Sequence, residues 1–358
     1  MHLAGYVEAQ RPGWGLSSYS TGMNSMRIFL FFALATIASS LAIPIKAQQP
    51  SAAAQTGAAL QLVIIDTDIG DDIDDAFALA LALRSPELRI LGVTTTFGDT
   101  ELRARLLDRY LALVGRSDIP VAAGPATKND NVFTQAAYAK QAAEKKHADA
   151  VEFILKQIGR HPGEITLIGI GPLFTVQAAI ERDPETFRKL KRVVIMGGSI
   201  FHGYGTDSTG KPKPAEPEWN INRDPAGARS LLGSGVPLFM MPLDSTQVHL
   251  EAKDREAIFS HGSPLTDQLT LLYRQWVAGT ELHTQTPTLF DPVAVTYSFH
   301  PDLCPASPMH IDVDEKGLTK PGPGAPNAQV CLKSDEKGFL DLLLKRVTSE
   351  QEKVSKGL

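Results

Sequence analysis

The stretch that decides the fold is LVIIDTDIGDDIDDAFALALAL, residues 62–83. It opens with the apolar, β-branched run 62–65, which predicts a buried strand. It ends with a helical pattern from about Asp74 to Leu83. Between the two, residues 66–75 contain six aspartates. A buried strand, an acidic turn and a helix in this order predict the first unit of an α/β fold.

The same alternation continues along the chain. Strand-like apolar runs cover 89–96, 164–170, 192–196 and 237–242, and a helical pattern covers 101–114. Continuous apolar strands between helices are typical of a parallel sheet that is covered on both faces. We therefore expect a single domain with an open, mostly parallel, Rossmann-like sheet and helices on both faces. Ligands of such sheets bind outside the carboxyl ends of the strands, where the polar residues gather here.

The first sixty residues do not resemble a folded domain. Arg27, an apolar run at 28–45 and the small residue Ala47 give the n-region, h-region and cleavage pattern of a signal peptide. A transmembrane anchor is the alternative, although the run is only marginally long enough. We predict a leader at 1–47 with a signal peptide at about 26–47, a disordered tether at 48–60, a catalytic domain at 61–348 and a tail at 349–358. The mature protein is then secreted or periplasmic, with membrane contact only through the signal segment.

Charge and cysteine content exclude some classes of protein. The chain has 358 residues and a formal net charge of −5, with no basic stripe, so a nucleic-acid polymer is not an expected partner. The two cysteines, Cys304 and Cys331, are too few for a Cys-rich zinc site. A disulfide between them and two unpaired buried thiols both remain open.

The aspartate cluster predicts a bound cation. Six ionised carboxylates in ten residues repel one another, and a helix N-terminus favours only one or two of them. A hard divalent cation with oxygen ligands accounts for the rest. A solvated acidic loop that caps a helix is the plainer alternative. An EF-hand is excluded because its twelfth position is Phe77 here. A haloacid dehalogenase-type phosphatase would use Asp66 as nucleophile and Asp68 as acid/base, but Gly70 stands where that family carries Thr or Val.

The cluster resembles the opening motif of the nucleoside hydrolase family, Asp-Thr-Asp-Pro-Gly-x-Asp-Asp-x-x-Ala. Residues 66–70 read Asp-Thr-Asp-Ile-Gly, and two extra residues precede Ile-Asp-Asp-Ala at 73–76. Pairing Asp74 and Asp75 with the Asp-Asp of the motif keeps the helix in place and is the preferred register, and the insertion leaves open which of Asp71, Asp72, Asp74 and Asp75 contact the metal. The resemblance extends over about 62–346, through similar segments in the same order at 92–99, 165–173, 196–198, 218–220 and 290–292.

This resemblance implies a calcium-dependent N-ribosyl hydrolase that acts on small-molecule nucleosides in purine or pyrimidine salvage and forms a homodimer or homotetramer. The metal ligands that it implies are Asp68, Asp75, Asp291 and the backbone carbonyl of Ile170. The substrate contacts that it implies are Asp74, Asp99, Met196, Glu218 and Asn220. Asp68 is also the implied general base, and Asp66 supports the cluster from behind.

These groups suit cleavage of an N-glycosidic bond. A cation can hold both the attacking water and the ribose hydroxyls, and it makes the water more acidic, so that a neighbouring carboxylate suffices as base. Carboxylates around the sugar also favour the positive charge that develops on it. No serine or cysteine nucleophile is needed.

Departure of the base is less well specified by the sequence. Many family members have a histidine immediately before the distal aspartate, and Phe290 stands there. Possible leaving-group contacts are His283, His202 and Tyr204. The last two lie on a long Gly/Pro-rich stretch, 201–217, which we expect to be a loop without secondary structure that could act as a lid. Trp276 and Tyr273 could stack on a base, or pack in the core. The missing histidine keeps open a ribose- or nucleoside-binding protein that has lost catalysis.

Overall fold

The sheet is built outward from one central strand. In the computed structural model, which describes residues 60–128, 131–280 and 285–349, β1 (Gln61–Thr67) pairs in parallel with β2 (Leu88–Thr95) on one side and with β5 (Ile165–Gly169) on the other. Because side chains alternate along a strand, Val63 and Ile65 enter one hydrophobic core and Ile64 enters the other. The apolar run that predicted a buried strand is thus buried on both faces.

Nine strands form the main sheet in the described part of the chain. The others are β3 (Val121–Ala123), β4 (Ala148–Asp149), β6 (Arg192–Met196), β9 (Leu238–Met241), β10 (Ala306–Met309) and β13 (Ala328–Cys331). Their order is β10-β13-β9-β6-β5-β1-β2-β3-β4, and among them β10 alone runs antiparallel to its neighbour. The chain builds one half from β1 to β4 and then returns to β5. This reversal between β1 and β5 is where an open α/β sheet offers a binding crevice.

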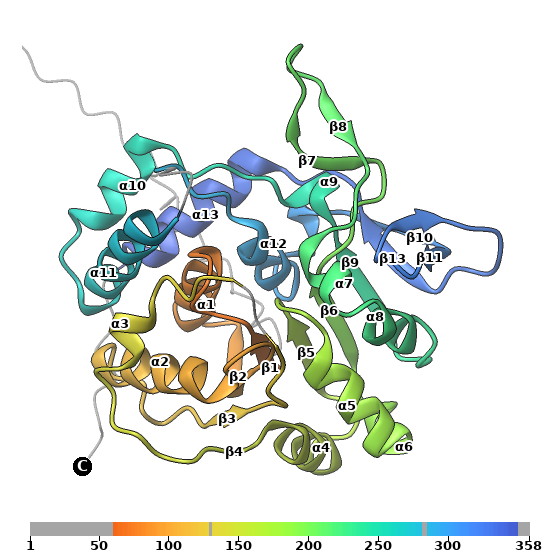
Figure 1. Ribbon diagram of the computed structural model, residues 1–358, viewed down its shortest axis with the longest axis horizontal. Helices are drawn as coiled ribbons and strands as arrows, with labels where there is room; N and C mark the ends of the chain where they lie inside the picture. Colours follow the sequence, from red (N-terminus) through yellow and green to blue (C-terminus); the bar gives the residue numbers. More distant parts are fainter. Residues whose placement is uncertain (1–59, 129–130, 281–284, 350–358) are drawn as a thin grey trace, which may run out of the picture. The chain divides into compact units, whose positions relative to one another are not determined.

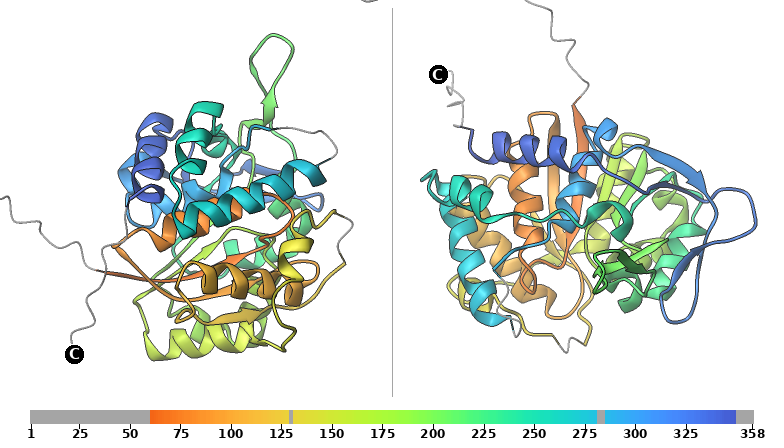
Figure 2. Two further views of the ribbon diagram at one scale, coloured as in Figure 1. Left: turned by 90° about the vertical axis from the view of Figure 1, so that its left-hand side faces the viewer. Right: turned by 90° about the horizontal axis from the view of Figure 1, so that it is seen from above.

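Helices cover both faces of the sheet, as predicted (Figures 1 and 2). The core that contains Val63 also receives α1 (Asp74–Leu83), α2 (Thr100–Leu113), α10 (Ala252–Phe259), α11 (Pro264–Gly279), α12 (Phe290–Tyr297) and α13 (Glu336–Val347). The core that contains Ile64 receives α4 (Ala150–Arg160), α5 (Phe174–Arg182), α6 (Pro184–Phe187) and α8 (Pro225–Leu232). Shorter helices are α3 (Ala136–Ala139), α7 (Trp219–Arg223), α9 (Leu243–Thr246) and η1 (Pro301–Leu303).

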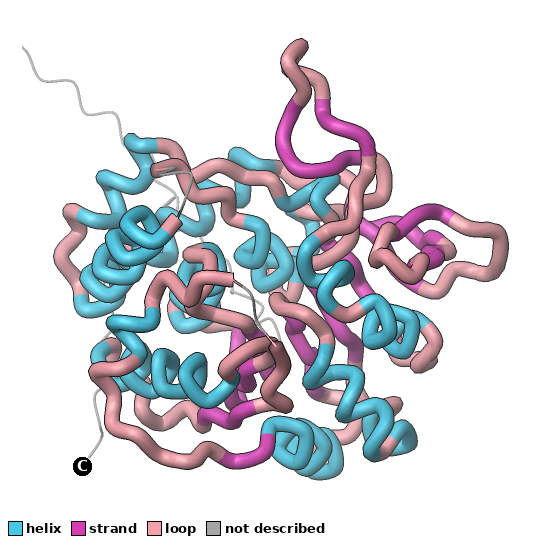
Figure 3. Tube along the Cα trace, viewed as in Figure 1, coloured by secondary structure: helices cyan, strands magenta, loops and turns pink. Residues whose placement is uncertain are grey.

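Two small antiparallel hairpins lie outside the main sheet. One pairs β7 (His202–Thr206) with β8 (Pro212–Pro214), and the other pairs β11 (Ile311–Val313) with β12 (Thr319–Pro321). The first corrects the expectation of a long loop without secondary structure at 201–217, because this stretch projects as a hairpin (Figure 3). Gly205 and Gly210 make it possible, since both adopt a positive φ that other residues rarely take.

Several predictions fall outside the described residues, namely the leader at 1–47, nearly all of the tether and the tail, and His283. Within the described ranges, no helix is long and apolar enough to cross a membrane. The structure also decides between the two states left open for the cysteines. Cys304, just after η1, and Cys331, on β13, form a disulfide with a Cα–Cα distance of 5.6 Å, and both residues are buried.

Candidate active site

A cavity of about 350 Å³ opens beyond the carboxyl ends of β1 and β5. This volume lies within the range of small-molecule sites. Residues from the β1–α1 turn, from the ends of β5 and β6 and from α7, α11 and α12 meet there. The lining residues are Asp68, Asp71, Asp72, Asp74, Asp75, Asn131, Val132, Ile170, Met196, Tyr204, Glu218, Trp219, Asn220, Trp276, Thr280, Phe290 and Asp291. The cavity therefore combines an acidic floor with an aromatic wall.

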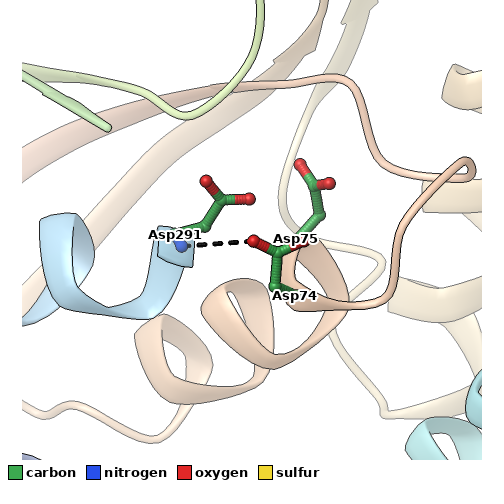
Figure 4. A group of neighbouring side chains, drawn as sticks. All are labelled: Asp74, Asp75 and Asp291. Atoms are coloured by element: carbon green, nitrogen blue, oxygen red, sulfur yellow. Dashed lines mark hydrogen bonds between the residues drawn. The ribbon is translucent and has the colours of Figure 1, made fainter. Parts of the chain in front are cut away.

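Three buried carboxylates form the tightest part of the floor. Asp74 and Asp75 lie in the first turn of α1, and Asp291 lies in the first turn of α12, so positions more than 200 residues apart converge (Figure 4). One carboxylate oxygen from each lies within 4.8 Å of the others. The backbone N–H of Asp291 donates to Oδ2 of Asp74 at 3.3 Å, and the hydroxyl of Thr67 donates to Oδ1 of Asp75. These hydrogen bonds hold the carboxylates in place against their mutual repulsion.

The electrostatics of this trio fit a cation. Burial raises the pKa of Asp74, Asp75 and Asp291 well above the ordinary value, and repulsion from neighbouring carboxylates raises each further. Among the described residues that line the cavity, none is a lysine, arginine or histidine. The donor set consists of hard oxygens, the ligands that Ca²⁺ and Mg²⁺ prefer. The trio could hold a divalent cation; it contains the predicted ligands Asp75 and Asp291 together with Asp74, and the predicted ligand Asp68 lies outside it.

Asp68 enters the same cavity from the end of β1. Burial raises the pKa of Asp68 to about 7; the positive charge of Arg103 lowers it, and the negative charge of Asp71 raises it. Gly171 leaves room for this carboxylate, because a Cβ there would lie 2.8 Å from Oδ1 of Asp68 and 2.9 Å from its backbone nitrogen. Asp66 lies outside the cavity lining. It accepts a hydrogen bond from the Thr94 hydroxyl at 2.6 Å, which places it behind the cluster.

Glu218, Asn220 and Met196 form a hydrogen-bonded group at another side of the cavity. Glu218 caps α7 and accepts from the backbone N–H groups of Gly198, Asn220 and Ile221 at 2.9, 2.9 and 3.1 Å. Burial raises the pKa of Glu218 to about 7, although these N–H donors oppose the rise. The side-chain nitrogen of Asn220 donates to the carbonyl of Met196 at 3.1 Å. Side-chain hydrogen bonds to the backbone therefore fix Glu218 and Asn220 at the cavity.

An aromatic wall faces the acidic floor. The ring of Tyr204, from β7, meets Phe290 edge-on with centroids 5.9 Å apart. The Tyr204 hydroxyl accepts from the backbone N–H of Trp219 at 2.9 Å, and burial raises the pKa of this tyrosine, so it is a weak proton donor. Trp276 lines the cavity, whereas Tyr273 lies outside the lining and its hydroxyl donates to the carbonyl of Gln285 at 2.7 Å.

Two of the predicted contact residues lie away from the cavity lining. Asp99 is exposed, and its carboxylate accepts from the backbone N–H of Leu102 at 3.0 Å as the N-cap of α2. His202 is half-buried on β7, and its carbonyl accepts from the Ser199 hydroxyl. Neither side chain is among those that line the cavity.

Several residues in or beside the cavity were not predicted from the sequence. The lining includes three such residues, Asn131, Val132 and Thr280, from segments without a recognisable motif. It also includes Asp71 and Asp72, which belong to the predicted acidic cluster but had no role assigned to them. Arg103 on α2 contacts the aspartate loop, residues 68–73 between β1 and α1, through Ile69 and Asp71. Nothing in the helical pattern around Arg103 distinguishes it from a surface arginine, so spacing alone could not have found it.

Comparison with known proteins agrees with this geometry. Residues 63–341 match the family described as inosine-uridine preferring nucleoside hydrolase. The chain is 30% identical over 315 residues to a pyrimidine-specific ribonucleoside hydrolase of Citrobacter koseri, over 80% of this chain and 97% of that protein. It is 32% identical over 271 residues to an uncharacterized protein of Schizosaccharomyces pombe, over 70% and 84% of the two chains.

Solved structures give the same result. A plant nucleoside hydrolase superposes with a TM-score of 0.71 at 26% identity, covering 81% of this chain and all of that one. A purine-preferring ribonucleoside hydrolase from Gardnerella vaginalis superposes with a TM-score of 0.68 at 25% identity, covering 80% and 98%. The similarity therefore spans nearly the whole of each relative.

Proposed function

The chain belongs to the inosine-uridine preferring nucleoside hydrolase family, and from that premise we propose that it is a Ca²⁺-dependent enzyme whose acidic cavity binds the ribose. It hydrolyses the N-glycosidic bond of ribonucleosides to ribose and free base. The observation that carries the assignment of the site is the convergence of Asp74, Asp75 and Asp291 in a cavity that Asp68 also lines. The phosphatase alternative is not favoured, because the family match covers 63–341.

The cation would be held by Asp68, Asp75, Asp291 and the backbone carbonyl of Ile170. All four residues line the cavity, and all donate oxygen. When bound, Ca²⁺ supplies positive charge that offsets the carboxylates and orients the ribose hydroxyls and the attacking water. Oδ2 of Asp74 already accepts the Asp291 N–H, which leaves its other oxygen for a ribose hydroxyl.

The protein side chains then accept the proton of the attacking water and stabilise the positive charge that develops on the sugar. Asp68 accepts a proton from the attacking water, whose oxygen forms a bond to the anomeric carbon. The carbon–nitrogen bond breaks, and its electron pair leaves with the base. Glu218 and Asn220, fixed by the hydrogen bonds around α7, contact the ribose, and Met196 lies against it. The negative floor favours the ribosyl cation that develops in between.

Protonation of the departing base is the step with the least support from side chains. Phe290 stands beside Asp291, and the described lining contains no histidine. Tyr204 is held at its hydroxyl by Trp219, and burial raises its pKa. We propose that the enzyme depends on stabilising the ribosyl cation more than on protonating the base. His283, His202 and Tyr204 remain the competing candidates for an acid.

Ribose release from three substrates tests this function. The protein is incubated with inosine, uridine and p-nitrophenyl riboside, with Ca²⁺ and with EGTA, and free ribose is measured. Ca²⁺-dependent release supports the proposal and also reports base preference, which matters because the relatives above are named as pyrimidine-specific and purine-preferring. Calorimetric binding of inosine without any ribose release would instead identify a nucleoside-binding protein. Release that is equal in EGTA would exclude Ca²⁺ as the cofactor.

We also propose that the mature protein is secreted or periplasmic and that it forms a homo-oligomer. The support for the location is the signal-peptide pattern at about 26–47 and the buried disulfide between Cys304 and Cys331, which suits an oxidising compartment. Fractionation of the source cells tests the location. Light scattering on the purified protein tests the oligomer, whose support is the family resemblance.

A further inference from the structure

Arg103 is a buried arginine that does not line the active-site cavity. Its side chain has 0% exposure, and it reaches the aspartate loop from α2. Nε donates to the carbonyl of Phe97 at 2.7 Å, Nη1 donates to the carbonyls of Asp68 and, at 3.0 Å, Ile69, and Nη2 pairs with Oδ2 of Asp71 at 2.9 Å. One guanidinium therefore binds three backbone carbonyls and one carboxylate.

Burial of such a charge is costly unless it is paired and hydrogen-bonded. The planar guanidinium can satisfy several acceptors at once, which an ammonium group cannot do in the same geometry. The group also lies 5.0 Å from the ring centroid of Phe133 and 5.8 Å from that of Phe97. This environment matches the planar shape and the several donors of an arginine side chain.

Every backbone carbonyl of residues 68–72 accepts a hydrogen bond from a residue outside this loop. The carbonyls of residues 68 and 69 accept from Arg103, and those of residues 70–72 accept from Thr134 and Gln135. Gly70 adopts φ +129, so the chain turns sharply within this segment. With five consecutive carbonyls bound on the outer side, the side chain of Asp68 is directed to the cavity.

We propose that Arg103 is a positioning residue for catalysis. By binding the carbonyls of Asp68 and Ile69 it fixes the direction of the Asp68 carboxylate, and through Asp71 it fixes the two inserted residues at the cavity. It touches neither substrate nor cation. The inference rests on the proposed function, since it acts through the role of Asp68.

The competing explanation is charge balance alone, in which any positively charged side chain at position 103 would offset the charge of the six aspartates equally well. Arg103→Lys separates the two explanations, because lysine keeps the positive charge but loses the planar group that binds several carbonyls at once. Arg105→Met is the matched control. Arg105 lies on the same helix, donates to the carbonyls of Ala142 and Lys140 at 2.9 and 3.3 Å and pairs with Glu144, so it holds a loop in a similar way and does not line the cavity.

The test compares kcat, KM, Ca²⁺ affinity by calorimetry and thermal unfolding for the unmodified protein, Arg103→Lys, Arg103→Met and Arg105→Met. Displacement of a reacting group by about 1 Å lowers a rate about 10²-fold, so we expect Arg103→Lys to lower kcat about 10²-fold with KM changed less than about threefold. We expect its Ca²⁺ dissociation constant to rise about 10- to 100-fold, as for other residues that orient ligands. Arg105→Met should leave kcat, KM and Ca²⁺ affinity within about twofold.

Two results would overturn the proposal. One is an Arg103→Lys variant whose kcat and Ca²⁺ affinity stay within about threefold of the unmodified protein, which would leave charge balance as the role. The other is an equal loss of kcat in Arg105→Met, which would indicate general destabilisation. If Arg103→Met fails to fold, Arg103→Lys carries the test. If the unmodified protein releases no ribose, the proposed function fails, and the Ca²⁺ affinity of Arg103→Lys still decides whether Arg103 positions Asp68.

Discussion

Removal of the cation should make the protein less stable as the pH rises. Burial raises the pKa of Asp66 and of Asp68 from 3.8 to about 7 and raises those of Asp74, Asp75 and Asp291 well above 3.8. Between about pH 4 and pH 7 the folded protein therefore binds more protons than the unfolded chain, and the free energy of unfolding falls with rising pH. Above the raised pKa values both states are ionised, and the loss is complete.

The magnitude can be worked from one carboxyl group. Asp66 shifts from 3.8 to about 7, and each pH unit corresponds to about 1.4 kcal/mol, so this group alone lowers the free energy of unfolding by about 4 kcal/mol. Native domains are stable by only about 5–15 kcal/mol. Ca²⁺ should oppose the loss, because a bound cation replaces the protons on the carboxyls that hold it and lowers the pKa of every carboxyl near it.

The assay is urea unfolding in EGTA and in saturating Ca²⁺ at about pH 5, 6, 7 and 8. We expect stability in EGTA to fall across this range and the stabilisation by Ca²⁺ to be larger at the highest pH. Asp291→Asn should reduce the pH slope in EGTA, whereas Asp267→Asn, on an exposed position of α11, should leave it unchanged. Stability in EGTA that rises from about pH 5 to pH 8, or an equal effect of Ca²⁺ at both ends, would refute the reasoning.

Three further predictions address the reaction. Asp68→Asn should lower kcat at least about 10²-fold with no loss of stability, because the base is lost and a buried charge is removed; kcat within about tenfold of the unmodified protein would exclude Asp68 as the essential base. Gly171→Ala should displace Asp68 and lower kcat about 10²-fold. It should also lower the free energy of unfolding in urea by about 1–3 kcal/mol. Unchanged kinetics would show that the loop moves to accommodate the added methyl group. p-Nitrophenyl riboside, whose phenolate leaves without a proton, should have a kcat/KM about 10²-fold or more above that of inosine, and Phe290→His should recover part of the inosine activity. Equal kcat/KM on both substrates, with Tyr204→Phe removing only the inosine activity, would identify Tyr204 as the acid instead.

The fold was predictable because its signal is local. A strand that is buried on both faces must be apolar at consecutive positions, as 62–65 is, and β1 is such a strand. The order of the strands was not predictable in this way, because the return of the chain from β4 to β5 beside β1 is set by long-range packing. The hairpin at 202–214 was missed because its turn depends on positive φ at Gly205 and Gly210, and a Gly/Pro-rich stretch is equally compatible with an irregular loop.

The site was predictable only where a motif or an unusual composition marked it. Six aspartates in ten residues indicate a cation from charge repulsion alone, and the structure brings Asp74 and Asp75 to Asp291 across more than 200 residues. For Asp99 the same kind of signal was ambiguous, because a carboxylate that follows a strand can also cap the next helix. In the structure Asp99 is the N-cap of α2. Asn131 and Thr280 line the cavity because of tertiary packing. A local sequence pattern cannot predict such a position.

The insertion at Asp71 and Asp72 leaves the residues on either side of it at the ends of their elements. Asp68 is tied to the end of β1, and Asp74 starts α1, so two additional residues between them must bulge rather than shift either end. A bulge exposes backbone carbonyls that need donors. Thr134 and Gln135 bind the carbonyls of Asp71 and Asp72, and Arg103 binds those of Asp68 and Ile69 just before the insertion. Asp71 in turn gives the buried guanidinium a carboxylate partner. The insertion thus provides the carboxylate that pairs with the arginine, and Asp72 joins Asp74 and Asp75 in the cavity lining.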